Sequence, residues 1–274
     1  MLSYQHGYHA GNFADVVKHL TLTRLIQYLI TKDKPLFYLE THSGKGLYDL
    51  KDSQALKTGE YLQGINLLWG QKSKLSKLSS PYLSLLKELN PTNELRYYPG
   101  SPLIAISELR EIDRLFCCEL HPREFEILQK LPKKNKRVFF SHSDGIDNLH
   151  SQLPPKERRG LIFIDPSFEI KQEYKTVPQA IKKAYARFST GIYCLWYPII
   201  DAYLHEQLLR NLRSITKDSF GIEFHLTKEP TPGMTSCGLW IINPPYTLKE
   251  EMNEILKNLT QIFNPNQSSF TIIN

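Results

Sequence analysis

The sequence predicts an α/β protein built on a doubly wound parallel sheet. Short apolar runs without alternation recur along the chain, and each ends in a polar or acidic turn. The stretches between them carry apolar residues at helical spacing. Runs of this kind are typical of strands buried on both faces, joined by crossover helices. The ligand crevice of such a sheet lies at the carboxyl ends of its strands.

Six apolar runs are predicted strands, and they cover residues 36–39, 115–118, 138–140, 161–164, 192–196 and 239–242. An amphipathic helix is expected over residues 10–30, before the first strand. Residues 51–97 are too long for one crossover and are rich in Leu, Lys and Ser. We expect them to form an inserted helical subdomain within a single domain of residues 1–274. Its lysines either face solvent or contact RNA.

Composition limits the class of protein. Among 274 residues, 41% are hydrophobic and 23% are charged, which is typical of a packed globular chain. The net charge of +6 favours a polyanionic partner, although many basic proteins bind no nucleic acid. The four cysteines form no CxxC pair, so neither a zinc site nor a disulfide framework is expected. Without a signal peptide or a membrane-spanning run, we expect a cytoplasmic protein.

Polar groups follow the first three strands where a nucleotide-like ligand would bind. A glycine turn over residues 40–46 follows the first strand but lacks the GxGxxG spacing of dinucleotide sites. Glu119 follows the second strand, where a carboxylate can accept from both hydroxyls of a ribose. Asp144 and Gly145 follow the third and would suit an adenine. Considered alone, Glu119 could equally be a helix N-cap or a surface acid. Asp144-Gly145, considered alone, could be an ordinary turn.

The strongest candidate for catalysis follows the fourth strand. The N6 atom of adenine is a poor nucleophile because its lone pair is delocalised into the ring. The Asp165 carboxylate and the Pro166 carbonyl could both accept from this amine and aim its lone pair at a methyl donor. Phe168 is expected to stack on the target base. The competing interpretation is an ordinary Asp-Pro that opens a loop.

The N-terminal segment is dense in histidines and polar aromatics. Lys18 and His19 are expected to face the crevice and meet an anion there, whereas Asp15 and Lys18 could equally form an ordinary helix pair. His6 and His9 lack a third ligand at suitable spacing, so no metal is expected.

In these residues and in the motifs given below, the sequence resembles the RlmJ family, which methylates adenine N6 in bacterial 23S ribosomal RNA. The resemblance covers essentially the whole chain. Its longest matching piece is Arg96-Tyr-Tyr-Pro-Gly-Ser-Pro-Leu-Ile-Ala105. Shorter matching pieces lie at residues 1–4, 9–12, 14–16, 18–19, 33–35, 41–42, 58–62, 119–122, 195–198 and 242–245.

The resemblance implies a monomer with a Rossmann-like, S-adenosylmethionine-dependent methyltransferase core and an inserted helical subdomain. It implies that the donor is held by His19, His42, Ser101, Glu119, Asp144 and Gly145. It also implies that Asp165 is the catalytic acceptor, with Tyr4, His6 and Lys18 near the substrate, 23S ribosomal RNA. The family motif Asp-Pro-Pro-Tyr is replaced here by Asp165-Pro166-Ser167-Phe168. Ser167 loosens the turn that aims the Pro166 carbonyl.

Several alternatives stay open. A DNA adenine methyltransferase would use the same acceptor chemistry, and Ser167 would suit a catalytically weakened protein that binds donor and rRNA. A dinucleotide oxidoreductase is disfavoured by the glycine spacing. Asn243-Pro244-Pro245-Tyr246 spells the adenine methyltransferase signature better than residues 165–168 do. We nevertheless expect it to brace the target base and Asp165 to be catalytic, because the run before Asn243 should lie farther out in the sheet.

Overall fold

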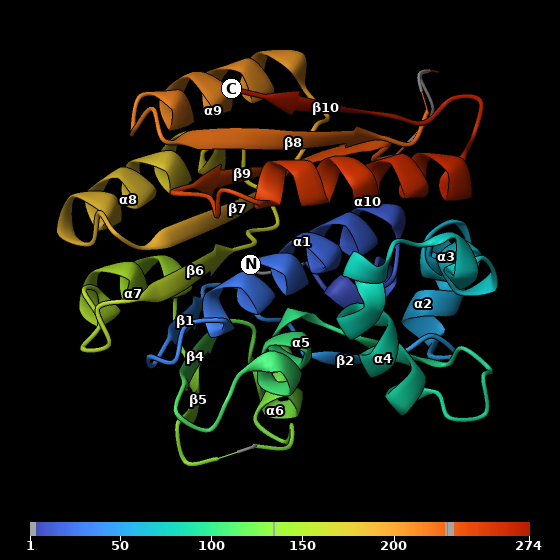
Figure 1. Cartoon of the computed structure of the whole chain (residues 1–274), viewed down its shortest axis with the longest axis horizontal. Coiled ribbons are helices and arrows are strands. Elements are labelled where there is room, and N and C mark those ends of the chain that lie inside the picture. The colour runs from blue at the N-terminus through green and yellow to red at the C-terminus, as the bar shows by residue number, and fades with distance from the viewer. Residues whose placement is uncertain (1–3, 134, 228, 230–232) are drawn as a thin grey trace.

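The computed structural model describes residues 4–133, 135–227, 229 and 233–274, and in them an eight-stranded sheet forms the centre of the molecule (Figure 1). In order across the sheet, its strands are β10 (Ser269–Ile273), β8 (Ser219–His225), β9 (Ser236–Ile242), β7 (Ile192–Pro198), β6 (Gly160–Ile164), β1 (Phe37–Glu40), β4 (Arg114–Glu119) and β5 (Val138–His142). All six predicted strands are present, and β8 and β10 were not predicted.

The pairing of strands changes from parallel to antiparallel at β9. Strands β5, β4, β1, β6 and β7 pair in parallel, as predicted, and β1 lies between β4 and β6. β9 runs antiparallel to β7, and β8 and β10 continue the antiparallel pairing. The expectation of a parallel strand before Asn243 was therefore wrong. This α/β sheet, parallel at its centre, forms a Rossmann-like core whose β1, β4, β6 and β7 end at one edge.

Helices cover both faces of the sheet. On one face α1 (Phe13–Ile30) packs between α5 (Ser101–Glu108) and α10 (Leu248–Phe263). On the other face α7 (Gly145–Gln152), α8 (Glu173–Arg187) and α9 (Ala202–Arg213) form a row (Figure 1). The short α6 (Pro122–Leu128) packs on β4 and β5. Within the described residues, no helix has both the length and the hydropathy needed to cross a membrane.

Helix α1 is buried on its polar side as well as its apolar side. It begins at Phe13, three residues after the expected start, because the Asn12 side chain accepts from the backbone N–H of Asp15 at 2.9 Å. The sequence predicted an amphipathic helix, whereas Asp15, Lys18 and His19 are each at most 3% exposed. Buried charged residues need partners, so α1 carries polar groups that must be satisfied inside the protein.

Residues 51–97 are mainly helical, as expected. They contain α2 (Ser53–Thr58), α3 (Ile65–Gly70), α4 (Ser80–Leu89) and the single turns η2 (Glu60–Gln63), η3 (Lys72–Lys74) and η4 (Lys77–Ser79); η1 (His6–Tyr8) precedes α1. The strands β2 (Leu47–Asp49) and β3 (Tyr97–Pro99), which were not predicted, pair at the two ends of this segment. Its buried Trp69 and Tyr82 belong to the same hydrophobic core as the central sheet. Its status as a separate subdomain stays a prediction.

Gly64 allows this helical segment to dock on the start of α1. A Cβ atom at position 64 would lie 2.2 Å from the carbonyl oxygen of Gly11 and 2.5 Å from the carbonyl carbon of Asn12. Both are backbone atoms, which cannot move aside as a flexible side chain can. The backbone N–H of Ile65 also donates to the Gly11 carbonyl at 2.8 Å, which fixes the contact.

We therefore expect Gly64→Ala to destabilise the protein by about 1–3 kcal/mol, the usual cost of overpacking a close contact. Gly70→Ala is the matched control, because nothing lies within 4 Å of a Cβ atom at position 70. Urea unfolding curves would measure both variants. Equal midpoints for the two would contradict the close approach at Gly64.

Candidate functional site

A cavity of about 600 Å³ lies where β1, β4, β6 and β7 end. The structure brings most of the sequence-predicted site residues to its wall, although they come from widely separated parts of the chain. They are Tyr4, His6, Lys18, His19, His42, Ser101, Glu119, Asp144, Gly145, Asp165 and Pro166. Of the predicted residues, Phe168 does not line this cavity.

A buried ammonium group links α1 to the end of β6. The Lys18 Nζ atom lies 2.8 Å from Asp15 Oδ1 and 2.7 Å from Asp165 Oδ2. Although burial disfavours the charged form, the two carboxylates raise the pKa of Lys18 above its ordinary value. The helix pair between Asp15 and Lys18 is therefore present, and the same ammonium also reaches Asp165.

The N-terminal segment extends this chain of contacts. His6 Nε2 lies 2.9 Å from Asp15 Oδ2, and His6 Nδ1 lies 2.8 Å from the Tyr4 hydroxyl. The same Asp15 oxygen accepts from the backbone N–H of Gly11 at 2.8 Å. Burial would raise the pKa of Asp15, but the charges of His6 and Lys18 and the hydrogen bond from His6 hold it well below its usual range. Asp15 is therefore ionised at neutral pH.

Lys18 and His19 do not offer free positive charge to an anion, contrary to expectation. The ammonium of Lys18 is already compensated by Asp15 and Asp165. Burial lowers the pKa of His19 to about 3, so its imidazole is neutral. His19 Nδ1 lies 2.7 Å from the Tyr98 hydroxyl, which orients the ring. A ligand beside His19 would meet a neutral hydrogen-bonding group.

Glu119 lies at the end of β4 and is held by backbone groups on both sides. Its Oε2 accepts from the N–H of Gly44 at 2.7 Å, and its Oε1 accepts from the N–H of His121 at 2.7 Å. Burial raises the pKa of Glu119 above its ordinary value. Each carboxylate oxygen has a further lone pair that can accept from a ligand.

Asp144 and Gly145 form the start of α7 beside the turn that follows β1. Asp144 Oδ1 accepts from the backbone N–H of Ile146 at 2.7 Å, so this side chain is also an N-cap. A Cβ atom at position 145 would lie 1.9 Å from the carbonyl oxygen of Thr41. Only glycine lets this backbone approach so closely. His42, the next residue, also lines the cavity, and burial lowers the pKa of its imidazole.

The sequence analysis missed two acidic residues close to this wall. Glu40 is fully buried at the end of β1 and accepts from the Tyr38 hydroxyl at 2.9 Å and from the Ser101 hydroxyl. Burial raises its pKa to about 8, so Glu40 is largely protonated at neutral pH. Its position directly after an apolar run, which drew attention to Glu119, could have identified it. Glu124 lines the cavity, and its buried Oε2 has no hydrogen-bond partner in the described structure.

The position of Phe168 corrects the expectation that its ring stacks on a base at this cavity. Phe168 is only 7% exposed, and its ring centroid lies 4.6 Å from that of Tyr174. Its backbone has φ of +54°, a left-handed conformation that bulky residues rarely adopt. This turn packs the ring into the core.

The sequence analysis also predicted the wrong position for Asn243. Because β9 is antiparallel to β7, it ends at the opposite edge of the sheet from Asp165. The Asn243 Nδ2 atom donates to the carbonyls of Ser189 and Gly191, each at 2.7 Å. The expected bracing of a target base beside Asp165 by Asn243-Pro244-Pro245-Tyr246 was therefore wrong.

Comparisons with known proteins identify relatives that are named as ribosomal RNA methyltransferases. The chain is 43% identical to Ribosomal RNA large subunit methyltransferase J of Escherichia coli over 93% of this chain and 92% of that protein. It is 43% identical to the protein of the same name from Haemophilus influenzae over 97% and 95%.

A crystal structure of protein LPL1258 from Legionella pneumophila matches with a TM-score of 0.93 and 56% identity, over 96% of this chain and 97% of that one. Residues 33–273 match the model of the family described as Ribosomal RNA large subunit methyltransferase D, RlmJ. The chain therefore belongs to the RlmJ family of ribosomal RNA methyltransferases.

Proposed function

We propose that the protein transfers a methyl group from S-adenosylmethionine to N6 of a single adenine in 23S ribosomal RNA. The observation that carries this proposal is the Asp165 carboxylate, which lies at the end of β6 on the cavity wall and is held by a buried lysine. Membership of the RlmJ family supports an RNA substrate of the large ribosomal subunit. The chemistry of the cavity favours an amine as the acceptor.

The part of the cavity beside β1, β4 and α7 suits the donor. Glu119 would accept from the ribose hydroxyls, and Asp144 and the Gly145 N–H would meet the adenine ring. Glu124 Oε2 is buried without a partner in the described structure, and such an atom gains when a ligand donates to it. His19, His42 and Ser101 would complete this wall as neutral groups. Bound S-adenosylmethionine would supply an electrophilic methyl group.

Asp165 and the Pro166 carbonyl would hold the target amine. The two N–H groups of N6 would donate to these two acceptors, which lie on the same side of the nitrogen. This arrangement favours a pyramidal nitrogen whose lone pair points toward the methyl donor. Lys18 occupies Oδ2 of Asp165, which leaves Oδ1 to accept from the amine. Because Lys18 is itself buried against Asp15, the carboxylate is fixed before substrate arrives. Such preorganisation is the usual source of electrostatic catalysis.

The charge balance of this cluster matches the reaction. Asp15 is compensated by His6 as well as by Lys18, and Lys18 contacts Oδ2 of Asp165, so Oδ1 of the Asp165 carboxylate has no cation beside it in the described structure. Positive charge develops on N6 as the methyl group is transferred, and it would be stabilised beside this cluster. His6 and Tyr4, which bind the far side of Asp15, would fix the cluster and border the substrate.

We expect Asp165→Asn to lower methyl transfer to unmodified 23S rRNA by about a hundred- to a thousand-fold, the loss typical of removing one preorganised electrostatic group. Affinity for S-adenosylmethionine should be unchanged, because Asp165 acts on the acceptor amine. Asp218→Asn, at an exposed aspartate, is the matched control and should keep full activity. Transfer of labelled methyl groups and calorimetry with the donor measure the two effects. Turnover close to that of the control would overturn the assignment of Asp165.

Glu119→Gln should weaken donor binding roughly ten- to a hundred-fold, or about 1.5–3 kcal/mol. Glutamine has one acceptor oxygen, so its NH₂ group must face the N–H of either Gly44 or His121. Glu126→Gln, at an exposed position of α6, is the control. Calorimetry with S-adenosylmethionine measures donor affinity, and filter binding should give the same RNA affinity for both variants. Unchanged donor affinity in Glu119→Gln would remove the ribose role.

A further inference from the structure

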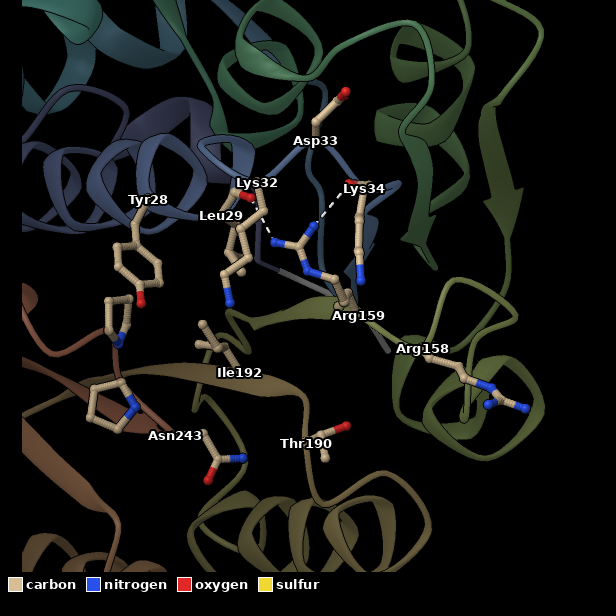
Figure 2. A pocket seen from close by; sticks show the side chains of 13 residues that line it. Tyr28, Leu29, Lys32, Asp33, Lys34, Arg158, Arg159, Thr190, Ile192 and Asn243 are labelled. Atoms are coloured by element: carbon tan, nitrogen blue, oxygen red, sulfur yellow. Dashed lines mark hydrogen bonds between the residues drawn. The ribbon is translucent and has the colours of Figure 1, made fainter.

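A second cavity, of about 670 Å³, lies at the opposite edge of the sheet, where β6 and β7 begin and β9 ends (Figure 2). Its wall comes from the end of α1, the loop of residues 31–35, and the turn at Asn243–Pro245. Four of its lining residues are basic, namely Lys32, Lys34, Arg158 and Arg159, and one is acidic, Asp33. Much of the chain's excess positive charge therefore borders this cavity.

Two arginines fix the loop that carries the lysines. Arg159 donates to the carbonyls of Lys34 at 2.8 Å and of Leu29 at 2.7 Å. Arg110 donates to the carbonyls of Lys32 and Lys34, each at 2.8 Å. Both guanidinium groups thus bind the backbone and hold residues 32–34 in one conformation.

The charged side chains of this loop point in different directions. The side chains of Lys32 and Lys34 point into the cavity, whereas Asp33 between them points away from it (Figure 2). Neither lysine has an ion-pair partner among the residues that the structure describes, and both are exposed. The pocket therefore presents two ammonium groups without a counter-ion. Burial and the nearby charge of Arg110 lower the pKa of Arg159, which indicates that cations are crowded here.

An exposed aromatic ring lies next to the wall of this cavity. Tyr246 directly follows Pro244–Pro245 of the cavity wall, and the residue is 84% exposed. Its ring packs against the lining residue Tyr28 at 5.9 Å between centroids, with the two planes at 80°. Asn243, with φ of +53° and two hydrogen bonds to backbone carbonyls, fixes the turn that presents Tyr246.

We infer that this cavity is a second RNA-binding site, which takes an unpaired stretch of the same rRNA that carries the target adenine. Lys32 and Lys34 hold phosphate groups, and Tyr246 stacks on a neighbouring base. Cations that follow the backbone, together with an accessible aromatic ring, are the combination that binds single-stranded nucleic acid. The inference rests on the proposed function for the identity of the RNA.

This site differs from the catalytic cavity in position and in chemistry. The catalytic cavity has its lysine neutralised by two carboxylates, so it contributes little attraction for the RNA backbone. The second cavity lies at the other end of the strands and contains no reacting group. It would add affinity and orient the RNA without touching donor or target base.

The first test is the charge-reversal variant Lys32→Glu/Lys34→Glu. We expect it to weaken binding of unmodified 23S rRNA by about ten-fold or more. The slope of log affinity against log salt concentration should flatten by about 1.4 units, because each phosphate contact on a single strand contributes about 0.7. Lys183→Glu/Lys257→Glu, at exposed lysines of α8 and α10, makes the same change in net charge and should bind nearly as the wild type does. Filter binding across a salt series measures both variants. Donor affinity, measured by calorimetry, should be unchanged in both.

The second test concerns the aromatic ring. Tyr246→Ala should weaken binding of a single-stranded RNA oligonucleotide on the order of ten-fold, because stacking on one base is lost. Tyr246→Phe keeps the ring and should restore the affinity. Fluorescence anisotropy with a labelled oligonucleotide measures this. If alanine and phenylalanine behave alike, no base stacks on this residue.

The outcomes separate this inference from the proposed function. Equal rRNA affinities for the two charge-reversal variants, with normal methyl transfer in the wild type, would overturn the second site alone. Selective loss of binding in Lys32→Glu/Lys34→Glu, with no methyl group found on adenine N6, would support the second site and overturn the proposed reaction. Competition by an acidic peptide but not by RNA would also overturn the inference.

Discussion

The salt bridge cluster of Asp15, Lys18 and Asp165 is the interaction on which the rest of the site depends. Asp15 and Lys18 belong to α1, and Asp165 follows β6, so the cluster joins two elements that are distant in the sequence. Removing Lys18 would leave the carboxylates of Asp15 and Asp165 without their shared ammonium group, which is far more costly than losing an exposed pair. The cluster therefore sets the position of α1 over the strand ends and the orientation of the carboxylate.

Much of the candidate site could be predicted because parallel strands end at one edge of a sheet. Glu119 and Asp165 each follow an apolar run directly, and the positions of β4 and β6 beside β1 bring both to one cavity. This rule needs only the place of each strand and its direction. It made no use of the contacts that hold the residues, such as the backbone N–H groups that bind Glu119.

The rest depended on direction and on burial, which the sequence pattern does not specify. An apolar run has the same pattern in a parallel and in an antiparallel strand. The sequence therefore did not indicate that β9 is antiparallel, which places Asn243 at the opposite edge of the sheet. The run Phe220-Gly-Ile-Glu-Phe224 alternates and could have identified β8. Phe168 was misjudged because one left-handed backbone residue decides whether its ring faces the cavity or the core.

The central claim is that the protein methylates adenine N6, and the product of the reaction tests it most directly. Unmodified 23S rRNA would be incubated with the wild-type protein and S-adenosylmethionine that carries an isotopically labelled methyl group. The RNA would then be digested to nucleosides for mass spectrometry. The account predicts that the label appears in N6-methyladenosine, at one adenine of the rRNA. Label on another atom or another nucleoside, or label in DNA but not in rRNA, would contradict it.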